Sequence, residues 1–375
     1  MRFWIFSALF FCDGYRTSKK SSEMKRINYF IVLFLVTLFY SCSEHSGSAI
    51  SEVSIEGIKV EIDSANMYMG PKFLCADLLY AWNMDFHGGK LSNGKWQKAD
   101  RLLASGSGHD EFGYMIMSIS NDRVLHVLNR SWTGSKYLSL VKIPHGDSIP
   151  AVKDKTKWER FDLKQMPLFS PNSKNFIVLS DSTILIAGTP YNDIKHIFSI
   201  IDFKNQKVST LDYWPADEMK CDDRKKNKLF TENSYILGNK KGKYLYQNNY
   251  IRNAFIFTFD GTTTKIISRL YSYSFGEKRS TEVLACCADE NRIYVLLRDS
   301  DGKGTKLEEW KNPFIFGNTI EVFDWDGVKQ QVIHLDQYGQ NILLSEDNNT
   351  LYLISDYSED ISEPFIYSYD LDAIY

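Results

Sequence analysis

The chain has 375 residues, with 44 Lys and Arg against 47 Asp and Glu, and 43% of its residues are hydrophobic. This composition excludes a disordered chain, a collagen-like fibre and a disulfide-dense miniprotein. The formal net charge of −3 also argues against a general nucleic-acid binder, which needs an excess of basic side chains.

The first 41 residues differ from the rest in charge. They carry six basic and two acidic side chains, so the remainder has a formal net charge of −7. Residues 24–41 have the layout of a signal peptide, because Met24, Lys25 and Arg26 precede an apolar run at 27–40. That run is shorter than the roughly 20 residues of a membrane-spanning helix. Residues 1–23 are then expected to be an upstream extension before a start at Met24; a competing signal at residues 3–12 has a weaker basic region.

The end of the apolar run predicts a lipid anchor. Phe39, Tyr40 and Ser41 precede Cys42, and a small residue before such a cysteine resembles a bacterial lipobox, although Phe39 and Tyr40 are bulkier than usual. In that motif the cysteine is lipidated and becomes the first mature residue. We therefore expect Cys42 to attach the protein to the outer membrane, facing the periplasm or the cell surface, with residues 42–52 as a linker. The alternative is a plain secretory signal with a chance cysteine.

Beyond the linker, the apolar pattern has a period of two, which predicts many short strands. One kind of run has the character of a middle strand and occurs at residues 78–82, 123–128, 183–187, 243–246, 292–297 and 350–354. A second kind follows after a loop, at residues 137–143, 197–203, 255–261, 320–327 and 365–370. Two of these end in an aromatic residue, Asp and Gly, at 259–261 and 325–327, which predicts tight turns.

The recurrence predicts an all-β, six-bladed β-propeller. Six units of about 55 residues fit four-stranded blades with modest insertions, and the period excludes helical repeats. Residues 53–375 would form this single domain. Residues 53–62 are strand-like and precede the first unit, so we expect them to fill the vacant edge of the last blade and close the ring.

The most specific motif is the segment 105–113, Ser-Gly-Ser-Gly-His-Asp-Glu-Phe-Gly. With the lipoprotein start and the six units, it resembles the TolB-like six-bladed β-propeller lipoproteins of Bacteroides-like bacteria, which often carry a Gly-x-Gly-Pro-Gly-Glu-Phe-like segment there. Gly106, Gly108, Glu111 and Phe112 match, whereas His109-Asp110 replaces the usual Pro-Gly. The resemblance covers roughly residues 50–375 and implies a fold and a cell-envelope location, since the family lacks a general chemistry.

Two interpretations of this motif remain open. It can be a blade connector, in which Gly106 and Gly108 supply turn conformations and Phe112 plugs the seam between two blades. Alternatively, His109, Asp110 and Glu111 bind a metal or perform acid–base chemistry, for which one histidine with adjacent carboxylates is weak support.

No complete catalytic or metal-binding motif occurs in the sequence. It lacks a nucleophile elbow, a His-Glu-x-x-His motif, a phosphate loop and a Cys-x-x-Cys pair, and residues 299–302 match a calcium loop only in part. Cys75, Cys286 and Cys287 are expected to fill the core, and Cys221 to be exposed. His126 is expected to pack within a strand. We therefore predict no catalytic residue, no metal and no cofactor.

The repeat predicts which loops share one face of the propeller. Loops between the second and third strands of each blade, at 129–136, 188–196, 248–254, 298–318 and 355–364, should emerge together with the between-blade loops at 106–113 and 215–233. This loop-rich face would gather the candidate binding residues Arg130, Trp132, Tyr191, Asp193, Tyr250, Arg252, Trp310, Tyr357, His109 and Glu111. Aromatic and Arg side chains are enriched in binding hot spots, although each one can also simply pack onto its own blade.

These observations favour a lipid-anchored, monomeric, non-catalytic binding or scaffold protein for a protein, peptide or glycan, with no nucleic acid as partner. The alternative is a hydrolase or lyase with its site in the central funnel, because fold alone does not decide function. A third interpretation is a purely structural envelope component.

Overall fold

The computed structural model describes residues 50–106, 108, 110–130, 138–163, 173–190, 192–215, 222–248, 253–271, 281–299, 316–355 and 364–375. Cys42 and the predicted signal peptide lie outside these residues. The contacts group Ser51–Tyr375 into one unit, to which the following description refers.

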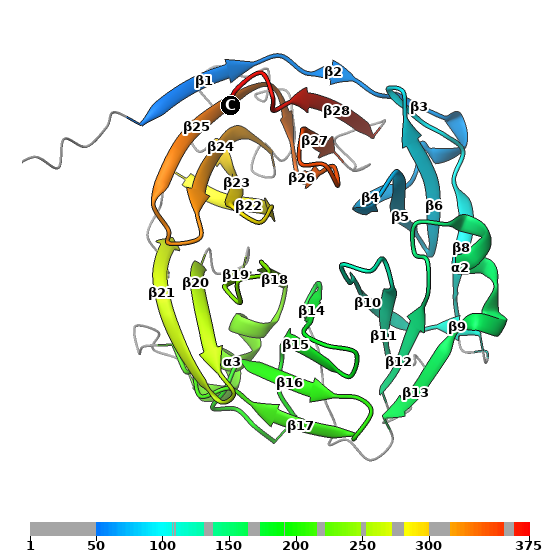
Figure 1. Cartoon of the computed structure of the whole chain (residues 1–375), viewed down its shortest axis with the longest axis vertical. Coiled ribbons are helices and arrows are strands. Elements are labelled where there is room, and N and C mark those ends of the chain that lie inside the picture. Colours follow the sequence, from blue (N-terminus) through cyan, green and yellow to red (C-terminus); the bar gives the residue numbers. More distant parts are fainter. Residues whose placement is uncertain are drawn as a thin grey trace, which may run out of the picture. The chain divides into compact units, whose positions relative to one another are not determined.

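The unit is an all-β propeller built from antiparallel sheets that follow one another along the chain. Figure 1 shows them around a common centre, with the first strand of each sheet innermost. The first sheet contains β4 (Gly70–Cys75), β5 (Leu78–Asn83), β6 (Asp85–Ser92), β7 (Lys95–Trp96), β8 (Asp100–Ser105) and β9 (Glu111–Phe112). The next contains β10 (Tyr114–Ile119), β11 (Leu125–Arg130), β12 (Leu138–Ile143) and β13 (Glu159–Leu163).

The later sheets repeat this order. They are β14 (Phe176–Val178), β15 (Thr183–Ala187), β16 (Phe198–Asp202) and β17 (Lys207–Thr210); β18 (Ser234–Gly238), β19 (Tyr244–Asn248), β20 (Asn253–Asp260) and β21 (Thr263–Tyr271); β22 (Thr281–Ala288), β23 (Arg292–Asp299), β24 (Gly317–Asp324) and β25 (Lys329–Gly339); and β26 (Asn341–Leu344), β27 (Thr350–Ser355) and β28 (Phe365–Asp370). The helical segments are η1 (Ser64–Asn66), α2 (Ile149–Lys153), η2 (Lys155–Lys157) and α3 (Asp223–Thr231).

The two predicted kinds of strand are confirmed as the second and third strands of the sheets. β5, β11, β15, β19, β23 and β27 fall on the first kind of run, and β12, β16, β20, β24 and β28 on the second. The second strands are apolar in their central part because neighbouring sheets cover both of their faces. In β15, Ile184, Leu185, Ile186 and Ala187 are all fully buried. The outer strand β13 has only Leu163 buried.

Hydrophobic clusters fill the seams between neighbouring sheets. One of them joins Leu185 and Phe198 of the β14–β17 sheet to Tyr246 and Phe255 of the β18–β21 sheet. Another joins Ile354 and Ile366 of the β26–β28 sheet to residues of the first sheet, including Leu79 and Trp96. The last sheet in sequence therefore packs against the first.

The N-terminal segment runs along the outer edges of three sheets (Figure 1). β1 (Ser51–Ile55) pairs in parallel with β25, β2 (Ile58–Lys59) pairs antiparallel with β28, and β3 (Glu61–Ile62) pairs in parallel with β7. The sequence predicts that residues 53–62 lie on the last sheet alone. An extended segment of that length spans about 30 Å, which exceeds the 17–20 Å of an average strand. Only Ile58–Lys59 forms ladder pairs with β28. The predicted pairing of residues 53–62 with the last sheet therefore occurs only in part.

The two predicted tight turns also occur. Gly261 follows β20 with φ +79°, and Gly327 follows β24 with φ +82°. Glycine adopts this left-handed conformation at low cost. At Gly327 a side chain would in addition overlap Ser268. These glycines therefore set the hairpins that return the chain to the outer strands β21 and β25.

Candidate functional site

Most of the predicted binding residues lie outside the described part of the chain. Of Arg130, only the backbone position at the end of β11 is described. Asp193 and Glu111 are described with their side chains. The residues outside are His109, Trp132, Tyr191, Tyr250, Arg252, Trp310 and Tyr357.

Three hydrogen bonds join between-blade segments to the ends of second strands or to the loop that follows one of them. The Gly113 amide, just before β10, donates to Asn129 Oδ1 at 2.8 Å, near the end of β11. Asn248 Nδ2 donates to the Glu232 carbonyl at 2.8 Å, and Asn227 Nδ2 donates to the His196 carbonyl at 2.6 Å. In each case a between-blade segment lies at the end of its sheet where a second strand ends.

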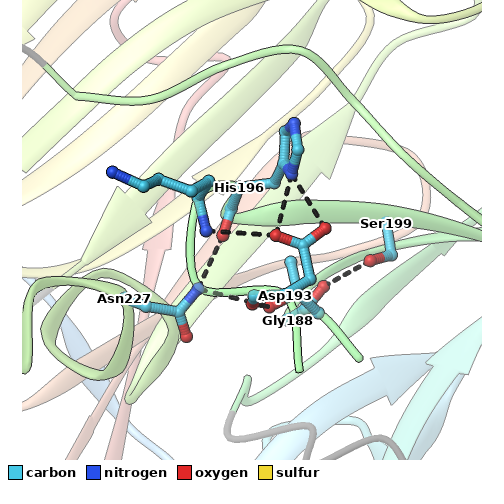
Figure 2. Close-up of polar contacts among 7 residues, drawn as sticks. Gly188, Asp193, His196, Ser199 and Asn227 are labelled. Atoms are coloured by element: carbon cyan, nitrogen blue, oxygen red, sulfur yellow. Dashed lines mark hydrogen bonds and ion pairs between the residues drawn. The ribbon is translucent and has the colours of Figure 1, made fainter. Parts of the chain in front are cut away.

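A carboxylate–imidazole pair lies in one of these loops. Asp193 and His196 lie in the loop between β15 and β16, where Asp193 N donates to Pro190 O at 2.8 Å and closes a turn. The turn brings His196 Nδ1 to 2.8 Å from both carboxylate oxygens of Asp193 (Figure 2). Because an ionised carboxylate only accepts, Nδ1 carries a proton and donates it, which leaves Nε2 of the neutral ring as an acceptor.

Helix α3 lies in the connection between β17 and β18, and it holds the β15–β16 loop in place. Asn227 on α3 donates through Nδ2 to the His196 carbonyl and, at 3.2 Å, to Thr189 Oγ1. Thr189 Oγ1 in turn donates to the Asp193 carbonyl at 2.7 Å, and Lys195 N donates to Asp193 Oδ1 at 3.1 Å. Both ends of the turn are thereby held, as Figure 2 shows. The orientation of the imidazole is preorganised.

Local sequence explains why α3 is in place. Asp222 caps the helix by accepting from Lys225 N at 2.9 Å, and Leu229 and Phe230 enter the aromatic seam. The Lys226 side chain is buried, and its Nζ donates to the Pro215 carbonyl at 2.7 Å and lies 5.0 Å from the Trp214 ring centre. Lys226 therefore ties the segment before the helix to the helix itself.

The pair remains accessible to a ligand. The side chain of His196 is 31% exposed and that of Asp193 is 22% exposed. The Lys195 ammonium, next in sequence to His196, pairs with Asp223 of α3 at 2.5 Å. The site can therefore offer an oriented imidazole acceptor beside a bound carboxylate, which suits a hydrogen-bonding ligand or proton transfer.

The described residues of segment 105–113 support the connector interpretation. Glu111 Oε2 accepts from Gly108 N at 2.8 Å, and a Cβ at Gly106 would overlap the Glu111 carboxylate. Phe112 is 1% exposed, lies 5.9 Å from the Trp158 ring and fills the seam between the first two sheets. Figure 1 places β9, which contains Glu111, at the outer edge beside α2 and β13. Asp193, by contrast, lies in the loop between β15 and β16 of another sheet.

Asp110, next to Glu111, is held by two cations. It accepts from Lys155 Nζ at 3.2 Å and from Arg160 Nη2 at 2.8 Å. Within the described ranges, no three His, Cys, Asp or Glu side chains gather as a metal site would require.

The other predictions for histidine and cysteine concern packing. His126 is 2% exposed, and burial lowers its pKa, so its packing in β11 is confirmed. Cys75 and Cys287 are buried free thiols, and Cys286, next in sequence to Cys287, is also free. Burial raises the pKa of Cys75 to about 12, which makes it unreactive at neutral pH. Cys221 lies outside the described residues.

Sequence reasoning selected Asp193 but missed its partners. His196 follows Asp193 by three residues in a loop that also contains Gly188 and Pro190, a spacing compatible with a turn that brings the two side chains together. Nothing in the sequence pairs Asn227 with this loop, because 31 residues separate Asn227 from His196.

No helix within the described ranges is long and apolar enough to cross a bilayer.

No protein-family model and no curated protein match the sequence. Among solved structures, a protein of unknown function from Dyadobacter fermentans shares 10% identity over 84% of this chain and 98% of its own, with a TM-score of 0.48. A protein described as exported, from Bacteroides fragilis, shares 9% over 85% and 99% (TM-score 0.47). A gluconolactonase from Xanthomonas campestris shares 10% over 81% and 86% (TM-score 0.44). Identities this low carry no statement about activity.

Proposed function

We propose that this protein is a lipid-anchored β-propeller of the cell envelope that binds a protein, peptide or glycan with its loop-rich face, without catalysing a reaction. The observation that carries the proposal is the Asp193–His196 pair, which is partly exposed and oriented by a network from two loops. Binding sites need such side chains held in place before the ligand arrives, since ordering them afterwards costs affinity.

The proposed architecture is a six-bladed TolB-like propeller whose ring is closed by the N-terminal segment. Its support is the pairing of β2 with β28, the flanking pairs of β1 and β3, and the cluster between the last and first sheets. Deleting residues 51–62 should expose these outer edges and lower the melting temperature sharply. An unchanged melting temperature would rule out a closing role.

The proposed anchor is a lipid on Cys42, by which the protein faces the periplasm or the cell surface. Replacing Cys42 by Ala should abolish fatty-acid labelling and release the protein from membranes. Continued labelling of the Cys42→Ala variant would disprove the anchor.

Binding is tested by screening the purified protein on glycan and peptide arrays and measuring the dissociation constant of each hit. His196→Ala should weaken binding at least about tenfold, because it removes an oriented hydrogen-bonding group from the site. His334→Ala is a matched control, since His334 also lies near a carboxylate, with Nε2 3.6 Å from Glu52, but on the outer strand β25. Equal losses in both variants would contradict the proposed site.

A second candidate is a hydrolase or lyase, placed by the sequence in the central funnel. The specific observation in its favour is that His196, with Nδ1 engaged by Asp193, presents Nε2 as a potential base on the loop-rich face. The purified protein should be assayed on esters, lactones and glycosides. Turnover that His196→Asn abolishes and His334→Asn preserves would replace the binding proposal by this one.

A further inference from the structure

A cavity of about 550 Å³ opens where β8, the connector before β10 and the α2–η2 segment meet. Figure 1 shows α2, β8 and β9 together at the outer edge, away from the β15–β16 loop. The cavity is within the size range of small-molecule sites. It is lined by Arg101, Leu102, Ala104, Gly108, Asp110, Glu111, Lys153 and Lys155. We call it the rim cavity.

The two acidic side chains of the rim cavity are already engaged. Glu111 accepts from the Gly108 amide and shapes the connector. Asp110 bridges two cations, Lys155 Nζ at 3.2 Å and Arg160 Nη2 at 2.8 Å. Both cations also lie against Trp158, with Lys155 Nζ 5.9 Å and the Arg160 guanidinium carbon 5.1 Å from the ring centre. Each carboxylate thus has a partner in the wall of the cavity.

The cations of the rim cavity retain capacity for an anion. Arg101 Nε binds Asp85 at 2.8 Å and Lys153 Nζ binds Asp100 at 2.9 Å, and neither carboxylate lines the cavity. A guanidinium has five N–H donors and an ammonium has three, so one ion pair does not use them up. The side chains of Arg101 and Lys153 are 57% and 45% exposed. Their charges are therefore reachable from solvent.

The remaining wall is apolar. Leu102, which belongs to the core and is 6% exposed, and Ala104 also line the cavity. An inorganic anion would leave this surface uncovered. A small organic molecule with a carboxylate matches both parts, because Arg101 can bind a carboxylate with two N–H groups while carbon atoms contact Leu102.

We propose that the rim cavity is a binding site for a small carboxylate-bearing organic molecule, separate from the loop-rich face. The site does not depend on the function proposed for that face. Arg101 and Lys153 bind the carboxylate, Leu102 and Ala104 contact the body of the ligand, and Asp110 and Glu111 hold the walls.

The test uses isothermal titration calorimetry of the purified protein with glucuronate, glucose and inorganic phosphate. Glucuronate and glucose share the ring and differ in the carboxylate. Glucuronate should bind, glucose should bind at least about tenfold more weakly, and added salt should weaken glucuronate binding. Equal binding of the two sugars, no binding of glucuronate, or phosphate binding as tight as glucuronate would overturn the proposal.

Variants identify the residues. Arg101→Gln and Lys153→Met should each weaken glucuronate binding about tenfold. Lys240→Met is the matched control, because Lys240 is an exposed lysine paired with Glu290 at 3.6 Å outside the rim cavity. Melting curves establish that each variant is folded. Unchanged glucuronate binding in folded Arg101→Gln protein would contradict the assignment.

Discussion

The site around His196 and the rim cavity differ in how their polar groups are satisfied. At the His196 site the side chains bind one another and the backbone, so that Asn227, Thr189 and Asp193 form one connected network. In the rim cavity Arg101, Lys153 and Lys155 each pair with a carboxylate, and most of these side chains are close to half exposed. The first arrangement fixes a geometry, whereas the second leaves charge available to an incoming group.

The difference also reflects what lies beneath each region. Under the β15–β16 loop, Phe198 stacks on Phe257 with ring centres 4.9 Å apart and contacts Tyr246 at 5.4 Å. Under the rim cavity, Phe112 and Trp158 close the seam. Apolar packing therefore supports both regions, but only the His196 site also has a connected hydrogen-bond network above it. Perturbing each region should have effects of different size.

The largest effect is expected from the aromatic seam. Phe198→Ala removes a fully buried ring from the cluster below the His196 site and should lower the free energy of unfolding by about 3–5 kcal/mol. Phe198→Leu keeps most of the volume and should cost less than half as much. Chemical denaturation measures both. If both variants lose the same small amount of unfolding free energy, the packing of Phe198 in this seam does not support the site above it.

A smaller effect is expected at the helix support. The buried Tyr246 hydroxyl donates to the Phe230 carbonyl at 2.5 Å, near the end of α3. Tyr246→Phe should cost about 1–2 kcal/mol, because it removes this bond while leaving the ring. If denaturation shows no loss, this hydroxyl does not contribute to holding α3 in place.

The network itself predicts a local effect. Asn227→Ala removes the donor that joins α3 to His196 and Thr189, so residues 192–198 should exchange amide hydrogens faster while the rim segment 149–157 stays unchanged. Asn205→Ala, which removes only a bond to Asp202 in the β16–β17 turn, is the control. Unchanged exchange at residues 192–198 would show that the loop holds its geometry without α3.

Acid is expected to lower the stability of the fold through His126, which lies outside both regions. Burial lowers the pKa of His126 in the folded state, so the unfolded chain binds a proton more readily below its ordinary pKa of about 6.5. Above that pH, His126 is neutral in both states and does not change the free energy of unfolding. As the pH falls below it, His126 lowers the free energy of unfolding by at most about 1.4 kcal/mol per pH unit. His126→Gln should flatten the dependence of stability on pH between about 7 and 5. An unchanged slope would assign acid sensitivity to other groups.

The smallest effect is expected at the rim cavity. Lys153→Met breaks an exposed ion pair with Asp100, and such pairs contribute about 0–1 kcal/mol. The melting temperature should hardly change, in contrast to Phe198→Ala. A large loss would mean that the cations of the rim cavity maintain the fold, which would weaken their assignment as ligand donors.

The strands and turns were largely predictable because they depend on local pattern. The buried run at β15 and the turn glycines Gly261 and Gly327 follow from apolar periodicity and backbone freedom. The path of residues 51–62 was predicted only in part, since pairing with β25, β28 and β7 depends on where three distant sheets end.

The candidate site was less predictable. Asp193 was selected from its loop, but His196 acquires its role only when the turn at Pro190 brings its ring to the carboxylate. The rim cavity was not predicted, because it needs the loop between β12 and β13 to form α2 and pack beside β8. Contacts between segments of different sheets leave no local signal in the sequence.

We propose that the loop-rich face around His196 is the binding surface of this propeller. The decisive experiment is to soak a crystal with a library of mono- and disaccharides and dipeptides. Ordered molecules are expected within hydrogen-bonding distance of His196 Nε2, in addition to any carboxylate bound at the rim cavity. Ligands that gather on the opposite face while the surroundings of His196 stay empty would contradict it.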